Sequence, residues 1–567
     1  MMGVADESVD EECSSDEEEE EECSSDEEEC SFGEEEDDEE ESSSDEDEDE
    51  EEDEEDVTGL LADVELNDYS DEEEVPVYFD VNEDVLGYHD DDNEKRFRKK
   101  KGQIQEEVPL EMQYSMFAEG SEQGLPEPFE FNPRYVGDKK SLNFLSHFTE
   151  MELVNYMWRT IAVHIVNCFN KRIHQENLIH VHELTLGELY RWYGLRLYMG
   201  IFQRPSEADF FREINFGMKI TPLENMSKYM SQTRFKEIKS TLRFDDYNSV
   251  PEEEKKDKAW KVRKIFNMMK TKCREGMPSP GKFISVDNAM VKYFGRHCPI
   301  AKSMPANPVK KGFMFYCAVD SETKWVFDID LSDSKYEGVF NESWGKSGQR
   351  VLDLLRPLSG EWYVVVLDRY YSSEPLAIEL LRRRFYMLGT LRENRLPLGT
   401  PTEMASLTKH PKPTKQYPKG TIKSCVKTNN TISLLSLIEC EHVYLLDTLH
   451  GPTAMDILIH KCKGKDDEHN VYKGFVDYNA KRRRARSLDS PHRTVVMHER
   501  VARWTVRFVD CLFNFALVQA WVAWRHHHPE DSRYDARDKF TMVVCGGLLD
   551  NQEDANQTSY NGIDHGN

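Results

Sequence analysis

Apolar residues recur at helical intervals in two separate stretches of the chain, residues 127–280 and 498–524. In the first stretch, Thr185 and Glu188 have the spacing of a capping box, in which each of the two side chains accepts a bond from the other residue's backbone N–H. Helices are predicted there over residues 185–202, 230–244 and 260–273. The second stretch predicts one long helix, whose apolar face carries Val501, Trp504, Phe508, Leu512 and Phe515.

The pattern changes at Pro280 to the alternation that is typical of strands. Residues 283–294 alternate in this way, and residues 312–320 and 324–332 predict a hairpin. The elements predicted next are a helix at 346–356, a strand at 362–367, a helix at 374–384 and a strand at 385–391. Strands interleaved with helices indicate an α/β unit with a mixed sheet.

The rest of the body is less regular. Residues 392–440, rich in Pro, Thr and Lys, are interpreted as an insertion, after which 442–449 predicts a strand that returns to the sheet. The most apolar helix-like run, 509–524, contains Asp510, Asn514 and Gln519, so we interpret it as a buried amphipathic helix. No run reaches the length of a membrane span, and we expect no membrane partner.

The net charge of −38 is divided between two parts of opposite sign. Residues 1–94 contain 50 of the 109 Asp and Glu residues and none of the 71 Lys and Arg residues, so the remainder carries a net charge of +12. Such a tract cannot bury enough apolar surface to fold, and we expect a disordered acidic tail. The tail is interpreted either as a binder of basic proteins or mimic of nucleic acid, or as a solubilising segment. Its serines beside acids are candidate phosphorylation sites: Ser14, Ser15, Ser24 and Ser25.

Cysteine usage and basic clusters bear on the compartment. Twelve cysteines without a C-x-x-C pair favour reduced thiols and predict no structural zinc site. The clusters RFRKKK (96–101) and KRRRAR (481–486) are typical of nuclear import or nucleic-acid binding. Since the N-terminus does not resemble a signal peptide, these clusters favour the nucleus.

Three aspartates are candidate metal ligands. Asp287 lies on the first predicted strand of the α/β unit, Asp368 directly follows the strand at 362–367, and Asp477 enters a predicted helix. Oxygen anions are the ligands that Mg²⁺ prefers. Two such ions about 3.5–4 Å apart promote phosphoryl transfer. An Asp after a strand also commonly opens a turn, which is the alternative for Asp368. Spacing along the chain does not show whether the three acids converge.

Several of these segments, taken together, resemble the piggyBac transposases and the host proteins derived from them. Residues 230–246 resemble that family's lead-in to the catalytic core, residues 286–326 its first catalytic block, and residues 367–395 its second. GFVD (474–477) resembles the third block, and Arg503-Trp504 matches an Arg/Trp pair beyond it. The resemblance implies a ribonuclease-H-like core in which the first and fourth strands are neighbours. It also implies that Asp287, Asp368 and Asp477 are the catalytic, metal-binding acids.

The same resemblance implies the domain organisation and the partners. The ribonuclease-H-like core is expected to be inserted into a split, mainly helical domain for DNA binding and dimerisation. The expected ranges are a disordered tail (1–94), a basic linker (95–126), the first helical part (127–282), the first part of the core (283–391), the insertion (392–440), the second part of the core (441–486), the second helical part (487–545) and a second disordered tail (546–567). The expected partners are double-stranded DNA and a second copy of the chain.

The implied cofactor is Mg²⁺, as two divalent ions for which Mn²⁺ can substitute. Basic residues are the candidate DNA contacts, because Lys and Arg release counterions from phosphate. They are Arg296, Lys310, Lys311, Lys481, Arg482, Arg483 and Arg503. Ordinary solvated surface charge is the alternative for each of them.

The chain departs from the family pattern at several places. Asn288 follows the first acid where the family often has Glu, and Ala480 stands three residues beyond the third acid where a further Asp is common. The family's zinc module is missing. Two hypotheses therefore remain. One is a cut-and-paste DNA transposase or domesticated derivative with a TTAA target. The other is a catalytically inactive nuclear DNA-binding protein that keeps the fold.

Overall fold

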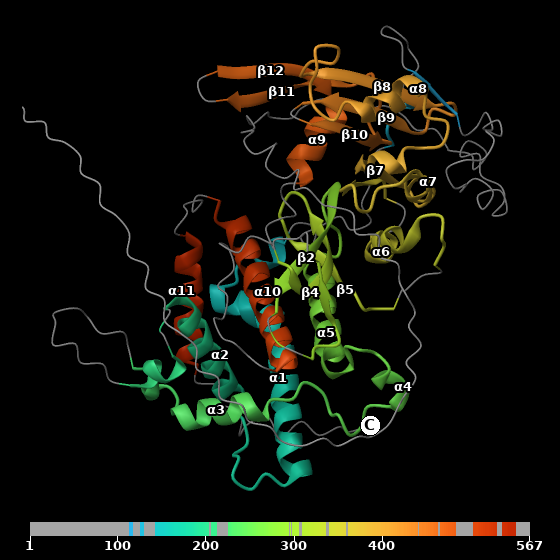
Figure 1. Ribbon diagram of the computed structural model, residues 1–567. Helices are drawn as coiled ribbons and strands as arrows, with labels where there is room; N and C mark the ends of the chain where they lie inside the picture. Colours follow the sequence, from blue (N-terminus) through green and yellow to red (C-terminus); the bar gives the residue numbers. More distant parts are fainter. Residues whose placement is uncertain are drawn as a thin grey trace, which may run out of the picture. The chain divides into compact units, whose positions relative to one another are not determined.

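The computed structural model describes the main body of the chain (Figure 1). The described residues are 113–116, 125–129, 142–202, 204, 206–212, 225–293, 295, 297–304, 309–335, 340–358, 361–439, 441–462, 465–482, 503–529 and 536–551. The acidic tail (1–94), the serines within it, and the candidate DNA contacts Arg296 and Arg483 lie outside these residues.

Within the described residues, ten strands form one mixed sheet. Along the sheet the order is β1 (Tyr114–Met116), β8 (Thr421–Lys427), β9 (Ser433–Ile438), β10 (His442–Asp447), β7 (Phe385–Leu391), β6 (Tyr363–Leu367), β2 (Phe283–Lys292), β4 (Lys311–Asp320) and β3 (Ala301–Ser303), and β5 (Val326–Leu331) also pairs with β4. The pairs β2–β6 and β6–β7 are parallel, and the other pairs are antiparallel. The predicted mixed sheet is confirmed.

The predicted elements of the α/β unit are present, with α6 (Gly345–Leu355) and α7 (Glu374–Arg382) between the predicted strands. Strand β6 is buried at all five positions, as expected of a central parallel strand. Helix α7 begins where Ser373 accepts a bond from the N–H of Leu376 and where Pro375 occupies the first turn. The prediction that the first and fourth strands are neighbours is confirmed by the pairing of β2 with β6.

The range 392–440, interpreted from the sequence as an insertion, contributes two strands to the main sheet. Strands β8 and β9 come from this range and extend the same sheet, because β9 pairs with β10 along its whole length. These strands are hard to recognise in the sequence because they are short and because Pro, Thr and Lys are frequent in the loops around them. A separate two-stranded hairpin, β11 (Met455–Cys462) and β12 (Lys465–Tyr472), was not predicted at all.

The helices of the first stretch include α1 (Glu150–Glu176), α2 (Leu186–Ile201), α3 (Gln232–Thr241) and α5 (Trp260–Gly276). The capping box predicted at the start of α2 forms only in part. The hydroxyl of Thr185 accepts a bond from the N–H of Glu188 at 3.1 Å. The carboxylate of Glu188 instead accepts two bonds of 2.7 Å from Arg234 on α3. A full capping box is found at α1, between Thr149 and Glu152.

Helices from both ends of the body pack together. Helix α10 (Trp504–His527) contacts α1 and α5, with the ring centroids of Trp158 and Phe513 5.1 Å apart. By length and composition α10 could cross a membrane, contrary to the expectation from the sequence, but 78% of its most apolar window is buried inside the protein. The last helix, α11 (Ala536–Leu549), continues four residues into the range 546–567 that was expected to be disordered.

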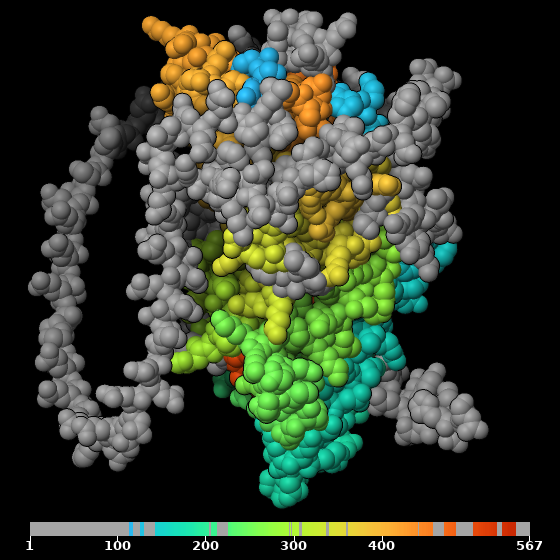
Figure 2. Space-filling model, turned by 90° about the vertical axis from the view of Figure 1, so that its right-hand side faces the viewer, coloured from blue at the N-terminus to red at the C-terminus, as the bar shows by residue number. Residues whose placement is uncertain are grey.

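The sheet is covered on both faces around β4, because neighbouring side chains of a strand point to opposite sides. Phe315 packs against Phe266 of α5 and Phe508 of α10, at centroid distances of 6.2 and 5.7 Å. The next residue, Tyr316, lies 5.7 Å beneath the guanidinium of Arg350 on α6. Figure 1 shows α10 and α6 on opposite sides of these strands. In Figure 2 the green and yellow residues of the α/β unit lie between the teal residues of the first helices and orange residues near position 400–440.

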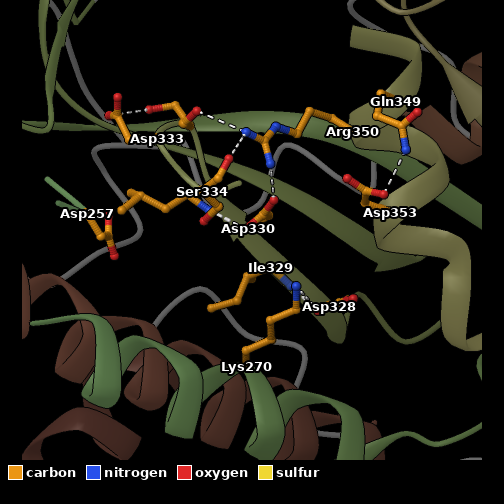
Figure 3. A network of polar contacts seen from close by, with 12 residues as sticks. Asp257, Lys270, Asp328, Ile329, Asp330, Asp333, Ser334, Gln349, Arg350 and Asp353 are labelled. Atoms are coloured by element: carbon orange, nitrogen blue, oxygen red, sulfur yellow. Dashed lines mark hydrogen bonds and ion pairs between the residues drawn. The ribbon is translucent and has the colours of Figure 1, made fainter. Parts of the chain in front are cut away.

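Strand β5 is an edge strand, and polar contacts cover its free side. Asp330 accepts a bond of 2.6 Å from Arg350, and Lys270 lies 3.8 Å from Asp328 (Figure 3). The side-chain amide of Gln519 on α10 pairs with both the N–H and the carbonyl of Val326, at 3.2 and 2.8 Å. Inward-pointing charges, and backbone groups that already have hydrogen-bond partners, prevent an edge strand from pairing with another chain.

Candidate active site

The first two predicted acids lie side by side. Strands β2 and β6 pair in parallel with Val286 opposite Leu367, so Asp287 and Asp368 are the next residues in register. Neighbouring strands are about 4.8 Å apart. Both side chains are partly exposed, whereas the strand residues before them are buried. The sheet therefore places two carboxylates at the point where its central parallel pair ends.

Asp368 also opens a turn, as the alternative interpretation proposed. Its Oδ1 accepts a bond from the N–H of Tyr370 at 2.9 Å, and its carbonyl accepts bonds from the N–H groups of Tyr371 and Ser372 at 3.2 Å each. Opening a turn does not exclude Asp368 from the site, because the turn holds its carboxylate in place next to Asp287. Burial, followed by the charges of Asp368 and Asp287, raises the pKa of Tyr371 well above its usual value. The Tyr371 hydroxyl is buried without a hydrogen-bond partner.

The third predicted acid is placed apart from the first two. Asp477 lies on α9 (Lys473–Arg482), and its Oδ2 is 2.7 Å from Nε2 of His450. Both side chains are largely shielded, with 14% and 20% exposure for His450 and Asp477. Among the residues described by the structure, no three His, Cys, Asp or Glu side chains form a group that could hold a metal ion. The three acids therefore do not meet in this arrangement.

A basic residue, Arg482, ends helix α9. Helix α9 packs on β2, β6 and β7, and its Lys481 carbonyl accepts a bond of 3.1 Å from Ser285, two residues before Asp287. Burial alone would lower the pKa of Arg482, but the charges of Tyr478, Asp368 and Asp287 outweigh it and raise that pKa. A DNA contact at Arg482 stays a prediction.

The other predicted DNA contacts differ in their surroundings. Lys310 and Lys311 are exposed, close to the exposed Lys292 at the end of β2. Lys481 lies over the ring of Phe283 at 4.7 Å. These three predicted contacts remain compatible with DNA binding.

Arg503 has a structural role that the sequence did not indicate. Its guanidinium donates to the carbonyls of Lys239, Ser240 and Leu242, at 3.3, 2.8 and 2.6 Å. These carbonyls lie at the end of α3, where the last turn of a helix has no N–H partners of its own. Burial lowers the pKa of Arg503. Arg503 therefore caps the end of α3, and a phosphate contact at this residue stays a prediction.

A cavity of about 820 Å³ lies elsewhere, between α5 and the end of β5. Its lining includes Asp257, Arg263, Lys270 and Asp330. Asp257, Lys270 and Asp330 are labelled in Figure 3. Arg263 donates to Asp257 at 2.6 Å and Lys270 lies beside Asp328, so these cations already have carboxylate neighbours. None of the three predicted catalytic acids lines this cavity.

The donors at the acid pair fit a divalent cation. Asp287 and Asp368 supply hard oxygen ligands, which suit Mg²⁺ and Mn²⁺ better than softer metals. A third oxygen donor would have to join them, and Asp477 is the nearest candidate along α9. The Nε of Arg482, at the end of the same helix, is buried without a hydrogen-bond partner among the described residues.

Sequence reasoning missed His450 and the orientation of Arg482. His450 follows strand β10 in the run LDTLHGP, which carries no recognisable motif. The only available signal for Arg482 was its spacing of four from Tyr478, which places both residues on one face of α9 and Asp477 on a neighbouring face.

Two comparisons identify the relatives of this fold. The model of a family described as Transposase IS4 matches residues 153–521. The structure is also similar to a piggyBac transposase, solved by cryo-electron microscopy as a synaptic complex with hairpin DNA. That similarity has a TM-score of 0.58 and 20% sequence identity, and covers 74% of this chain and 84% of the other. The family match includes most of the body, so this chain belongs to the piggyBac-type Transposase IS4 family.

Proposed function

We propose that this protein is a piggyBac-type DNA transposase, or a domesticated derivative, that cleaves and transfers DNA strands at element ends in a Mg²⁺-dependent reaction with a TTAA target. The observation that supports this proposal is the register of β2 and β6, which sets Asp287 beside Asp368 in a chain of the transposase family. Two adjacent carboxylates supply oxygen ligands and negative charge in the arrangement that phosphoryl-transfer enzymes use.

In this proposal each acid has a defined task. Asp287 and Asp368 would hold the divalent cations, and Asp477 would supply a third carboxylate. Bound Mg²⁺ or Mn²⁺ would supply activation of the attacking oxygen and neutralisation of the charge that develops on phosphate. The turn after β6 keeps the Asp368 carboxylate in place through the N–H of Tyr370.

The exposed lysines support DNA as the substrate. Lys292, Lys310 and Lys311 are exposed at one end of β2 and β4, where they can bind phosphates. We further propose that the protein acts as a homodimer, because two element ends must be held for paired cutting, and that it works in the nucleus, where the basic clusters would direct it. Basic proteins are proposed as partners of the acidic tail.

A nicking assay on labelled DNA ends tests the catalytic assignment. Asp368→Asn keeps the side-chain shape and the turn but removes the charge that holds the metal. Nicking in Mg²⁺ is expected to fall by orders of magnitude, with folding and DNA binding unchanged. Asp287→Asn and Asp477→Asn are expected to behave alike, and the double variants are expected to be no worse than the single ones because the acids act as a unit. Asp538→Asn, at an exposed position of α11, is the matched control.

A second function, non-catalytic DNA binding, is favoured by one observation. Asn288 and Ala480 stand at the two positions where the family pattern often has a further acid. If the wild-type protein binds DNA with a steep salt dependence but is inert in both Mg²⁺ and Mn²⁺, the catalytic proposal fails. Ala480→Asp is then the rescue variant, and its failure would favour the non-catalytic function.

A further inference from the structure

The turn after β6 carries the Asp368 carboxylate, and the far end of this turn is fixed in the core. There Tyr371 is 1% exposed, and its ring lies edge-on to Tyr316 of β4 with the centroids 6.3 Å apart. The hydroxyl of Ser372 donates to the Asp368 carbonyl at 2.9 Å. The same hydroxyl lies against β7, where a Cβ added to Gly389 would be 2.3 Å from it.

The near end of the turn lies at the surface, where Arg369 is exposed and Tyr370 is partly exposed. The N–H of Tyr370 donates to Oδ1 of Asp368 at 2.9 Å, and this bond orients the carboxylate. That N–H and the carbonyl of Arg369 belong to one planar peptide group, so a partner that holds the carbonyl also sets the direction of the N–H. The orientation of the Asp368 carboxylate therefore depends on peptide groups at the surface side of the turn.

Arg395 holds these peptide groups from the neighbouring strand. It ends η10 (Glu393–Arg395), shortly after β7, and β7 pairs in parallel with β6, so the two strands end at the same edge of the sheet. Nη1 of Arg395 donates to the Tyr370 carbonyl at 2.7 Å, and the Arg369 carbonyl is 3.5 Å from the same nitrogen. Hydrogen bonds from a charged donor are about twice as strong as neutral ones. Arg395 thus closes the side of the turn that the core does not hold.

We propose that Arg395 is a positioning residue for Asp368. By holding the turn after β6, it keeps the N–H of Tyr370 directed at the carboxylate that lies next to Asp287. This inference rests on the proposed function, because it concerns an acid assigned there to the divalent cation. Partners that orient metal ligands change metal affinity or activity by about 10–100-fold when they are removed. A direct contact of Arg395 with DNA phosphate is the alternative, and it would weaken DNA binding instead.

Metal affinity is the first readout, with Mn²⁺ alone as the probe, measured by electron paramagnetic resonance on the full-length protein. Arg395→Met keeps an unbranched stem but loses the donors, and Mn²⁺ binding is expected to weaken about tenfold. Arg395→Gln, whose amide is too short to reach the carbonyls, is expected to behave alike and decides the question if Arg395→Met does not fold. Arg395→Lys retains a charged donor and should recover most of the affinity. Arg525→Met, at an exposed position of α10, is the matched control.

The second readout separates turnover from DNA binding. The nicking rate at saturating DNA is expected to fall about tenfold in Arg395→Met and Arg395→Gln. The Kd for duplex DNA and its salt dependence should stay at the wild-type values, because the residue acts through Asp368 and not on phosphate. A purely structural role would lower the melting temperature by circular dichroism without this split between turnover and binding.

The outcomes distinguish the inference from the proposed function. Wild-type Mn²⁺ affinity and nicking in both loss variants overturn the inference and leave the proposed function intact. Tighter Mn²⁺ binding also overturns it, because Arg395 would then act by repelling the cation. Weaker DNA binding with a reduced salt slope and unchanged Mn²⁺ affinity assigns Arg395 to the DNA interface and overturns it as well.

The converse outcome is equally clear. Weaker Mn²⁺ binding in Arg395→Met and Arg395→Gln, recovered in Arg395→Lys, supports the inference even when the wild type does not nick DNA and the proposed function fails. A wild type that neither binds Mn²⁺ nor nicks DNA overturns both.

Discussion

The guanidinium of Arg196 bonds to both carboxylate oxygens of Asp510, at 2.6 and 2.7 Å, across 314 residues of sequence. The two side chains are only 2% and 1% exposed. Arg196 also lies over the ring of Trp192 at 4.6 Å. This pair joins α2 to α10 inside an apolar environment, so it determines how the two helical stretches fit together.

Breaking this pair is expected to destabilise the protein strongly. Asp510→Ala leaves the buried Arg196 charge without its partner, and such losses cost about 3–5 kcal/mol. The melting temperature by circular dichroism checks the prediction. Glu253→Ala, which removes an exposed ion pair with Lys256, is the control and should change stability by less than about 1 kcal/mol. A wild-type melting temperature in Asp510→Ala would contradict the assigned role.

Arg503 and Lys311 are expected to show opposite phenotypes. Arg503→Ala removes the donors at the end of α3 and should lower stability by about 1–3 kcal/mol, with little effect on DNA affinity. Lys311→Ala should leave stability unchanged and reduce the slope of log affinity against log salt by about 1. Fluorescence anisotropy with duplex DNA at several salt concentrations measures the second effect. If Arg503→Ala also reduces the slope of log affinity against log salt, Arg503 contacts DNA phosphate.

Stability is expected to decrease between pH 6.5 and pH 4 because of His442. Burial lowers the pKa of His442 to about 4, while Nε2 of the ring bonds to Ser436 at 2.8 Å. Below about pH 6.5 the unfolded chain takes up a proton that the folded chain excludes, so the stability is complete above that pH and is lost as the pH falls toward 4. Partial exposure of the ring limits the loss to about 1–2 kcal/mol.

The measurement for His442 compares melting temperatures at pH 7.5 and pH 5. His442→Gln retains a donor but does not titrate, so its melting temperature should depend less on pH than that of the wild type. His526→Gln, at an exposed position, is the control. If the melting temperature depends equally on pH in the wild type and in His442→Gln, groups other than His442 cause the loss of stability at low pH.

Gly474 is expected to tolerate no side chain. In Gly474→Ala the methyl group would overlap Oδ2 of Asp447, and the resulting strain should cost about 1–3 kcal/mol or displace α9. Gly546, with nothing within 4 Å of an added Cβ, provides the control, because Gly546→Ala in α11 should be neutral or stabilising by up to about 1 kcal/mol. Melting temperatures of the two variants make the comparison.

The sequence was most informative where burial is complete. Strands such as β6 could be predicted because a run of Val and Leu has few alternatives to a central strand. Strand β9, SLLSLI, has no β-branched residue before its last position, and β12, KDDEHNVY, has almost no apolar pattern, so neither was found. Helical ranges were predicted well because their apolar period extends over several turns.

The candidate site was predictable only in part. The pairing of β2 with β6 brings Asp287 and Asp368 together, and the family resemblance implied that these two strands are neighbours. The position of Asp477 depends on which face of α9 meets the sheet. Neighbouring helical residues point about 100° apart. That face is selected by the contacts of α9 with Asp447 and Ser285, which lie far from α9 in the sequence.

The distance in sequence between α2 and α10 has a consequence for biosynthesis. A ribosome that adds about 5–20 residues per second needs about 15–60 s to pass from Arg196 to Asp510, which are 314 residues apart. During this interval Trp158 and Arg196 have been made, but their partners on α10 have not. The nascent first half therefore presents an incomplete apolar surface, and an arginine that still lacks Asp510, until the last helices emerge, and chaperones can bind it during this interval.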